Sequence, residues 1–473
     1  MVFSSLLFLF WFIPIFFALY YICPAKWRNI TLFAGSIVFY AWGEPSYLIL
    51  IFVSILVNWA AGLAIARFRS SHDGYHIRWE KITFVAAMIF DFGMLFVFKY
   101  TGFFVSNINS LFNTSFRDPA FTLPLGISFY TFQIASYVID LYRGKIKEER
   151  NILTLGTYLV MFPQLIAGPI VVYSQVSEEL HKREITPQKV AEGIAVFILG
   201  LSSKVLIANT VGELWKDLEL IGYERISMPL AWLGVVSFTL QIYFDFNGYS
   251  LMARGLGKML GFDIPMNFNY PYISLSLTEF WRRWHMTLSG WFRDYVYIPL
   301  GGNRKGKIRT YVNLFIVWFL TGFWHGAGWN FICWGLFFFV LLSLEKSFLG
   351  DFLNRHRLFA RLYSLLLIGL SWMIFAITDF HKLGVYFSRL VAFSSIGASN
   401  DFVYYARNYG VVIAIGCIMS ASLVPGWLRS VIKPGSGVAA REIVGIAVQV
   451  VLLFMCVCYL ADASYNPFLY FRF

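Results

Sequence analysis

A histidine in an apolar, glycine-rich stretch is the first residue whose type and setting suggest chemistry. His325 lies in the sequence WFLTGFWHGAGWNF at 318–331, and we expect it in the middle of a membrane helix, with Trp324 and Asn330 as neighbours that orient it or line a tunnel. Ionisable side chains inside a membrane are costly and are therefore candidates for function. Imidazole titrates near neutral pH and suits general-base catalysis. We therefore predict a catalytic residue, the structural alternative being a histidine that only hydrogen-bonds a neighbouring helix.

A second histidine lies in a segment where cationic and indole side chains alternate. The sequence FWRRWHMTLS at 280–289 contains Arg282, Arg283 and His285. This mixture is typical of a helix at the lipid headgroups or of one that lines a tunnel. His285 and His325 are far apart in the sequence and lack the spacing of metal ligands, so we predict no metal site.

A carboxylate at the end of an apolar span is the third candidate. Asp245 lies in YFDFNGYS at 243–250, two residues before Asn247. It caps the next helix or orients a catalytic histidine, and the residues leave both interpretations open.

The composition indicates the setting of these residues. Of the 473 residues, 58% are hydrophobic and only 14% are charged, which is too little charge for the surface of a soluble protein. So much apolar surface also excludes a disordered chain. The net charge of +12 is typical of basic cytoplasmic loops, and we predict no nucleic-acid binding.

Apolar runs predict an all-α, polytopic membrane protein in one domain, 1–473, with about 11 spans. Residues 247–303 are too polar to span and too apolar for a free loop, so we expect half-buried or re-entrant helices there. The basic cluster Arg304, Lys305, Lys307 and Arg309 predicts a cytoplasmic loop. The loop from Arg429 through Lys433 to Arg441 is predicted to be cytoplasmic for the same reason, and the one span after it, 443–463, then places the C-terminus outside. The candidate spans are 2–22, 46–66, 83–105, 122–142, 152–172, 190–208, 228–246, 312–344, 362–379, 409–425 and 443–463.

Several long motifs follow one another through the chain and together are far more specific than any short pattern. They are FYAWGEPSYL at 39–48, PLGISFYTFQIASYVIDLYRG at 124–144, FPQLIAGPIV at 162–171, YFDFNGYSLMARGLGKMLGF at 243–262, FNYPYISLSLTEFWRRWHMTLSGWFRDYVYIPLGGNRKG at 268–306 and TGFWHGAGWNF at 321–331.

With these motifs the chain resembles the membrane-bound O-acyltransferase family, and most closely its bacterial alginate O-acetyltransferase branch. The resemblance implies helices around a central tunnel, with core motifs at 122–345 and C-terminal helices at 362–463. It implies that His325 is the embedded catalytic histidine and that His285 is the second histidine of this branch. One departure is Leu251, where the branch usually has an aspartate.

The resemblance also implies substrates and a location. The donor would be cytoplasmic acetyl-CoA or another acyl-CoA, with no metal, and the acceptor an exported or cell-surface polysaccharide such as alginate. In this interpretation His325 acts as general base, and His285 or Asp245 orients it or stabilises the oxyanion. The basic cluster at 304–309 would attract the phosphates of CoA. The protein would lie in the bacterial inner membrane, in contact with lipid.

The end of the chain adds a further candidate. Residues 468–473 read FLYFRF and resemble the aromatic ending of acyl-export systems in this family. Tyr470 is then either an acyl relay or part of an interfacial aromatic anchor. A separate extracytoplasmic transferase of the SGNH type, or a small membrane partner, would complete the transfer.

Three other functions stay open at this point. A transporter for polysaccharide or lipid-linked sugar would explain the spans and the aromatic richness. A non-catalytic docking subunit would tolerate substitution of both histidines. Within the same family, a D-alanyl transferase is the near alternative, although the residues in the motifs disfavour it.

Overall fold

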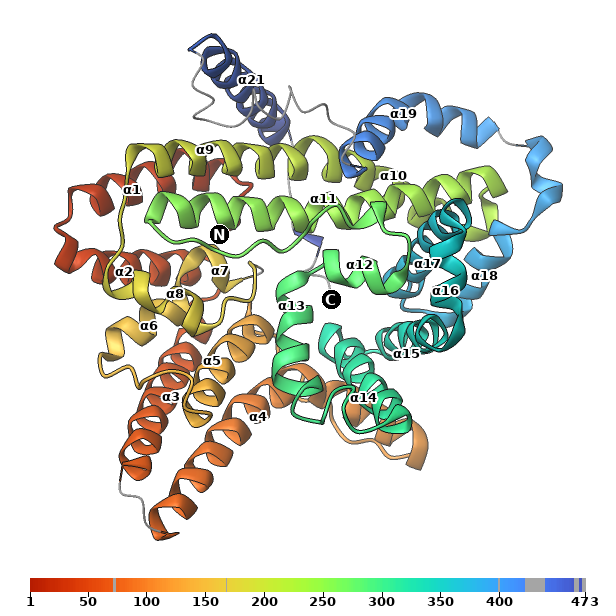
Figure 1. The fold of residues 1–473 in the computed structure, drawn as a ribbon. Helices are drawn as coiled ribbons and strands as arrows, with labels where there is room; N and C mark the ends of the chain where they lie inside the picture. The colour runs from red at the N-terminus through yellow and green to blue at the C-terminus, as the bar shows by residue number, and fades with distance from the viewer. Residues whose placement is uncertain (71–73, 167, 399, 422–438, 463–467, 470–473) are drawn as a thin grey trace. The chain divides into compact units, whose positions relative to one another are not determined.

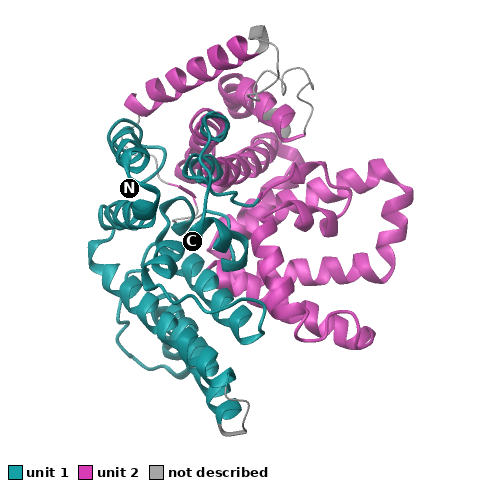
Figure 2. Ribbon diagram, turned by 60° about the vertical axis from the view of Figure 1, so that its left-hand side comes forward, with its two compact units in different colours: residues 1–193, 253–265 teal, residues 194–252, 266–473 magenta. Residues whose placement is uncertain are grey.

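The computed structural model describes the chain except residues 71–73, 167, 399, 422–438, 463–467 and 470–473. Every regular element among the described residues is a helix (Figure 1), so the all-α class is confirmed. The chain divides into two compact units, residues 1–193 with 253–265 and residues 194–252 with 266–473 (Figure 2). Each unit is described by itself, and the single domain expected from the sequence stays a prediction.

Eight helices in the described part of the chain are long and apolar enough to cross a membrane, which fits a multi-pass membrane protein. The N-terminal segment Phe8–Ile22 is apolar but shorter. The eight candidate spans are Pro45–Arg69, His76–Phe112, Pro187–Ile221, Met228–Leu260, Trp329–Arg355, Arg357–Ala376, Asn400–Ser420 and Glu442–Asp462.

The first unit is built around a hairpin of long helices. Helices α3 (Leu48–Arg69) and α4 (Gly74–Phe112) pack along each other, and α5 (Ile127–Tyr142) packs on both. Arg69 at the end of α3 donates hydrogen bonds to the carbonyls of Leu141 and Tyr142, each at 2.7 Å, and so fixes the end of α5. The other helices of this unit are α1 (Ile13–Ile22), α2 (Arg28–Ala41), α6 (Ile152–Val160), α7 (Phe162–Leu165) and α8 (Tyr173–His181).

The span expected at 152–172 is wrong, because the helix breaks at Met161. Helix α6 ends at Val160, and the four-residue α7 begins at Phe162. Pro163 explains the break, since a proline inside a continuing helix would clash with the preceding turn and lacks the N–H for its hydrogen bond.

The second unit carries both histidines. The predicted span 312–344 is two packed helices, α14 (Lys307–His325) and α15 (Trp329–Leu344), joined by three residues (Figure 1). His325 therefore ends a helix, and its expected position in the middle of one is wrong. Gly322 explains the close packing, because a Cβ there would lie 2.4 Å from the carbonyl oxygen of Phe331.

The segment expected to contain half-buried helices includes two short helices in which three of seven residues each are buried. Helix α11 (Met228–Leu260) runs further than expected and takes in residues 247–260. After it come α12 (Leu277–Arg283) and α13 (Met286–Phe292), which at seven residues each are about 10 Å long and too short to span a bilayer. Their depth in a membrane stays a prediction.

The other helices of the second unit precede and follow these short ones in the sequence. Helix α9 (Pro187–Ser202) continues through the π-helical turn η4 (Ser203–Ala208) into α10 (Asn209–Ile221). The others are α16 (Gly350–Arg355), α17 (Arg357–Ala376), α18 (Phe380–Leu390), α19 (Asn400–Ser420) and α21 (Ala439–Asp462).

Candidate active site

His285 lies at the break between α12 and α13, in an unusual backbone conformation. Its φ of +43° falls in the left-handed region, which a residue with a side chain rarely adopts. Only 1% of the residue is exposed. Such strained residues persist when the surrounding structure fixes them, and they gather at functional sites.

Asn267 fixes the protonation pattern of the His285 ring. Its side-chain oxygen accepts hydrogen bonds from the backbone N–H of Thr287 at 3.3 Å and from the Thr287 hydroxyl at 2.9 Å. Its amide nitrogen donates to the Ser250 hydroxyl at 3.1 Å. The Thr287 N–H can only donate, so the Asn267 atom that it contacts is the amide oxygen and not the amide nitrogen. This same oxygen lies 3.0 Å from His285 Nδ1 and accepts a hydrogen bond from it. His285 Nδ1 therefore carries the proton, and Nε2 carries a lone pair.

The lone pair of His285 has the properties of a proton acceptor. Nε2 is buried and has no hydrogen-bond partner in the described part of the chain. The residue lies outside the candidate spans, and burial lowers the pKa of His285 to about 3, so the ring is neutral at physiological pH. A neutral imidazole with Nδ1–H cannot donate from Nε2, so the predicted role of His285 in stabilising an oxyanion is disfavoured.

Aromatic rings bring the two histidines into one cluster. The indole of Trp324 lies with its ring centre 6.3 Å from that of His285 and 5.1 Å from that of His325. His325 is 5% exposed and also packs edge-on against Trp334 and Phe375, with ring centres 5.0 and 5.4 Å away. Residues far apart in the sequence therefore share one buried, largely apolar surrounding, in which electrostatic interactions are strong.

Glu345 holds the helix that leads to His285. This carboxylate is 6% exposed and accepts hydrogen bonds from the backbone N–H of Leu277 at 2.7 Å and of Thr278 at 2.9 Å. The Thr278 hydroxyl donates a third at 2.6 Å. An anion at the first turn satisfies N–H groups that have no partner within the helix. Glu345 thus fixes the start of α12.

Two predicted site residues on α12 differ in their surroundings. Arg283 pairs with Glu279 at 2.9 Å and donates to the Asn269 carbonyl at 3.1 Å, which joins α12 to the preceding loop. Arg282 is exposed. Arg283 therefore fixes α12 to its surroundings, whereas Arg282 presents an exposed positive charge.

Asn330 supports α17. Its amide nitrogen donates to the carbonyl oxygens of Phe375 at 3.1 Å and Ile374 at 3.4 Å, near the end of that helix. The residue is buried, and these bonds join the start of α15 to the segment that packs on His325.

Asp245 pairs with a lysine that the sequence analysis did not consider. Lys204 Nζ lies 2.5 Å from Asp245 Oδ1, and the other carboxylate oxygen accepts the backbone N–H of Leu469 at 2.7 Å. Both charged side chains are almost fully buried. Asn247, two residues further along α11, is half-buried.

The remaining predicted residues lie at the surface or outside the described part. The basic cluster is exposed, with Arg304 and Lys305 before α14 and Lys307 and Arg309 in its first turn. Tyr470 lies outside the described residues, whereas Phe468 and Leu469 lie within them.

Sequence reasoning missed Asn267, Lys204 and Glu345. Asn267 follows no recognisable motif, and its role depends on contacts with residues 17 to 20 positions away. Lys204 is the one lysine or arginine in the span expected at 190–208, and the cost of burying it was the available signal.

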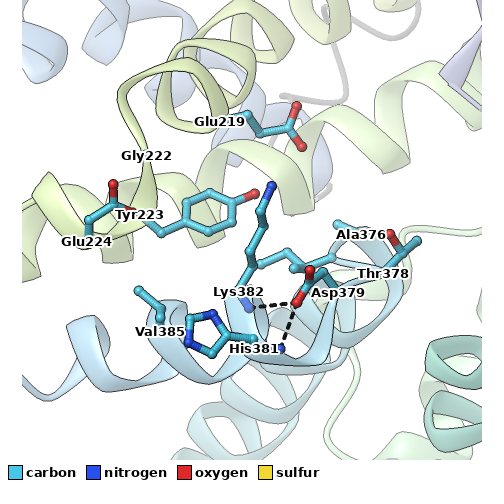
Figure 3. Close-up of a pocket in the computed structure, with 11 residues that line it drawn as sticks. Glu219, Gly222, Tyr223, Glu224, Ala376, Thr378, Asp379, His381, Lys382 and Val385 are labelled. Carbon is cyan, nitrogen blue, oxygen red and sulfur yellow. Dashed lines mark hydrogen bonds between the residues drawn. The ribbon is translucent and has the colours of Figure 1, made fainter.

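A separate pocket of about 570 Å³ lies in the second unit (Figure 3). It is formed by the end of α10, the turn after it, and the start of α18, where Asp379 accepts the backbone N–H groups of His381 and Lys382. Neither His285 nor His325 lines it. Its residues are Glu219, Gly222, Tyr223, Glu224, Ala376, Ile377, Thr378, Asp379, His381, Lys382 and Val385.

The helical fold with its apolar spans defines a multi-pass membrane protein. Residues 146–387 match the model of the membrane-bound O-acyltransferase family. The chain is 35% identical to a probable alginate O-acetylase AlgI of Pseudomonas putida, over 100% of both chains. It is 42% identical to the corresponding Pseudomonas aeruginosa protein, over 73% of this chain and 66% of that one.

A more distant relative acts on a different polymer. The chain is 34% identical to a peptidoglycan O-acetyltransferase of Helicobacter pylori, over 79% of this chain and 77% of that one. The chain therefore belongs to the membrane-bound O-acyltransferase family and is an O-acyltransferase, as the motifs predicted.

Proposed function

We propose that the protein transfers an acetyl group from cytoplasmic acetyl-CoA to the outer face of a bacterial inner membrane, where it O-acetylates a polysaccharide. The names of the relatives support acetyl as the group and a polysaccharide as the acceptor. The observation that carries the chemistry is the buried Nε2 of His285, which meets no hydrogen-bond partner among the described residues, with the tautomer of the ring set by Asn267.

The reaction needs a base because a hydroxyl is a weak nucleophile. The hydroxyl oxygen attacks the thioester carbonyl carbon, and its proton passes to an imidazole nitrogen. The C–S bond then breaks, and the departing thiolate takes the proton from the imidazolium. The atoms balance, since a thioester and an alcohol give an ester and a thiol.

Either histidine can be the base, and the geometry favours His285 for the proton-accepting step. The sequence predicts His325, and that assignment stays a prediction. In our scheme His285 Nε2 accepts the proton and later returns it to the leaving thiolate, and His325 donates a hydrogen bond to the oxyanion. The low pKa of His285 makes its imidazolium short-lived, so the proton moves on to the thiolate.

The path of the acyl group completes the proposal. The exposed cations at 304–309 attract the CoA phosphates on the cytoplasmic side. The first acceptor is the hydroxyl of Tyr470 or of a partner protein. An extracytoplasmic transferase of the SGNH type then passes the acetyl group to the polymer.

The test measures release of free CoA from acetyl-CoA by the purified protein in lipid nanodiscs, with a soluble hydroxyl acceptor. We expect His285→Gln and His325→Gln each to lower kcat by at least about a hundredfold. His381→Gln, at the separate pocket, is the matched control and should keep normal activity.

The outcomes separate the alternatives. Full activity in both histidine variants, at normal expression, would overturn the catalytic assignment and favour a docking subunit. Absence of thioester cleavage in the wild-type protein, together with movement of a sugar across the bilayer, would favour a transporter.

A further inference from the structure

Lys204 and Asp245 meet where two helices touch backbone to backbone. A Cβ added to Gly248 would lie 2.8 Å from the Gly200 carbonyl oxygen, and one added to Gly200 would lie 2.5 Å from that of Gly248. This close approach brings the turn after Gly200 against the turn before Gly248. The ion pair, at 2.5 Å, lies directly beside the contact.

The turn that carries Lys204 is not an ordinary α-helical one. It belongs to the π-helical segment η4, which lies between α9 and α10. Such turns are rare and occur frequently at functional sites, because they redirect a side chain at a cost in helix stability.

A buried ion pair needs further hydrogen bonds to offset its loss of hydration. Here the second carboxylate oxygen of Asp245 receives one from the main chain of Leu469, at 2.7 Å. A backbone N–H that donates to a carboxylate makes a charge-assisted bond. The C-terminal segment therefore contributes a hydrogen bond to the buried pair.

The residue before Leu469 is buried next to the catalytic cluster. Phe468 is 3% exposed, and its ring centre lies 4.9 Å from that of Tyr249 and 5.9 Å from that of Phe246. His285 also contacts Phe246, with ring centres 4.8 Å apart. One phenylalanine ring therefore contacts both the C-terminal segment and the proposed base.

We propose that the Lys204–Asp245 pair is a docking site for the chain's own C-terminal segment, which it holds beside the ring that contacts His285. Phe468 is the apolar anchor, and the N–H of Leu469 is the polar one. The pair positions the segment and does not take part in proton transfer. This inference rests on the proposed function, because it places the residue before Tyr470 where an acyl relay needs it.

The sharpest test removes the backbone N–H of Leu469 and leaves both side chains of the buried pair unchanged. Leu469→Pro has no N–H to donate to Asp245, whereas the matched variant Leu469→Ala keeps it. Hydrogen–deuterium exchange of the C-terminal peptide is measured on the full chain in nanodiscs. We expect exchange at the remaining amides to rise at least about tenfold in Leu469→Pro and much less in Leu469→Ala.

Two variants at the pair itself complete the test. Asp245→Ala leaves a buried lysine and can impair folding, so the double variant Lys204→Met with Asp245→Leu removes both charges and keeps an apolar interior. Both should give fast exchange of the C-terminal peptide. Asp379→Ala is the control, because Asp379 also accepts backbone N–H groups in this unit but lies at α18.

The results also separate this inference from the proposed function. Unchanged exchange in Leu469→Pro and in the folded double variant would overturn the docking site, whatever the activity. Fast exchange with transfer to the outer acceptor lost, but CoA release to a soluble acceptor retained, would support positioning. Activity that survives in both histidine variants would instead overturn the proposed function and leave the exchange result standing.

Discussion

Asn267 accepts hydrogen bonds from three groups through one side-chain oxygen, and one of them comes from His285. The sequence pointed to both histidines, because an ionisable side chain among tryptophans stands out in a membrane protein. It did not point to Asn267, since an asparagine in a loop carries no signal of its partners. The residue types were predictable, whereas the tautomer that decides their chemistry required the contacts.

Asn267→Asp should change the pH dependence of catalysis. The new carboxylate would accept the Nδ1–H of His285 and stabilise the imidazolium, so the pKa of His285 would rise from about 3. A base must be neutral, so activity is lost as the pH falls through this pKa. The wild-type enzyme should show no loss from His285 between about pH 5 and 8, and the variant should lose activity in that range.

The measurement is kcat/KM for acetyl-CoA across that pH range in nanodiscs. Ser250→Ala is the control, since it removes only the partner of the Asn267 amide nitrogen. A variant profile as flat as that of the wild type, at full activity, would count against His285 as the proton acceptor.

Helix α14, which ends at His325, packs closely on α15 because glycines lie at their contact. Glycines at 322 and 335 let α14 and α15 touch, because a Cβ at either position would lie 2.4 Å from a carbonyl oxygen of the other helix. Gly322 belongs to the glycine-rich stretch that the sequence analysis singled out, and it meets a backbone, whereas its partner Gly335 was not predicted. The sequence did not predict the turn after His325, because the apolar run continues through the chain reversal.

Gly322→Ala should destabilise the protein by about 1–3 kcal/mol, because the new methyl group must push α15 away. His325, three residues further along α14, should shift with it, and activity should fall. Gly384→Ala is the matched control, since a Cβ there meets no atom within 4 Å. It should change stability by less than about 1 kcal/mol.

Thermal unfolding in detergent and CoA release are measured on both variants. Equal melting temperatures for Gly322→Ala and Gly384→Ala would show that α14 and α15 separate at no cost. The close contact would then not be what positions His325.

At the scale of the whole molecule, the composition predicted a multi-pass helical protein, and the structure has eight helices among its described residues that fit this. The all-α class and the family were predictable, since they rest on apolar length and long motifs. The break at Met161 and the short helices α12 and α13 were harder to place, because hydropathy cannot distinguish a spanning helix from one buried by protein. The predicted orientation of the protein in the membrane still rests on the charge of the loops.

The exposed cations at 304–309 test that orientation together with the donor. If this loop is cytoplasmic and attracts CoA, replacing Arg304, Lys305, Lys307 and Arg309 by glutamine should raise the KM for acetyl-CoA by roughly threefold to tenfold with little change in kcat, because only attraction of the donor is lost. The increase should shrink at high salt, where the cations of the wild type are already screened. Lys145→Gln with Lys147→Gln, at two cations that are also exposed, is the control for a change in net charge elsewhere. Equal KM values for wild type and the fourfold variant at low salt would remove this loop from donor binding.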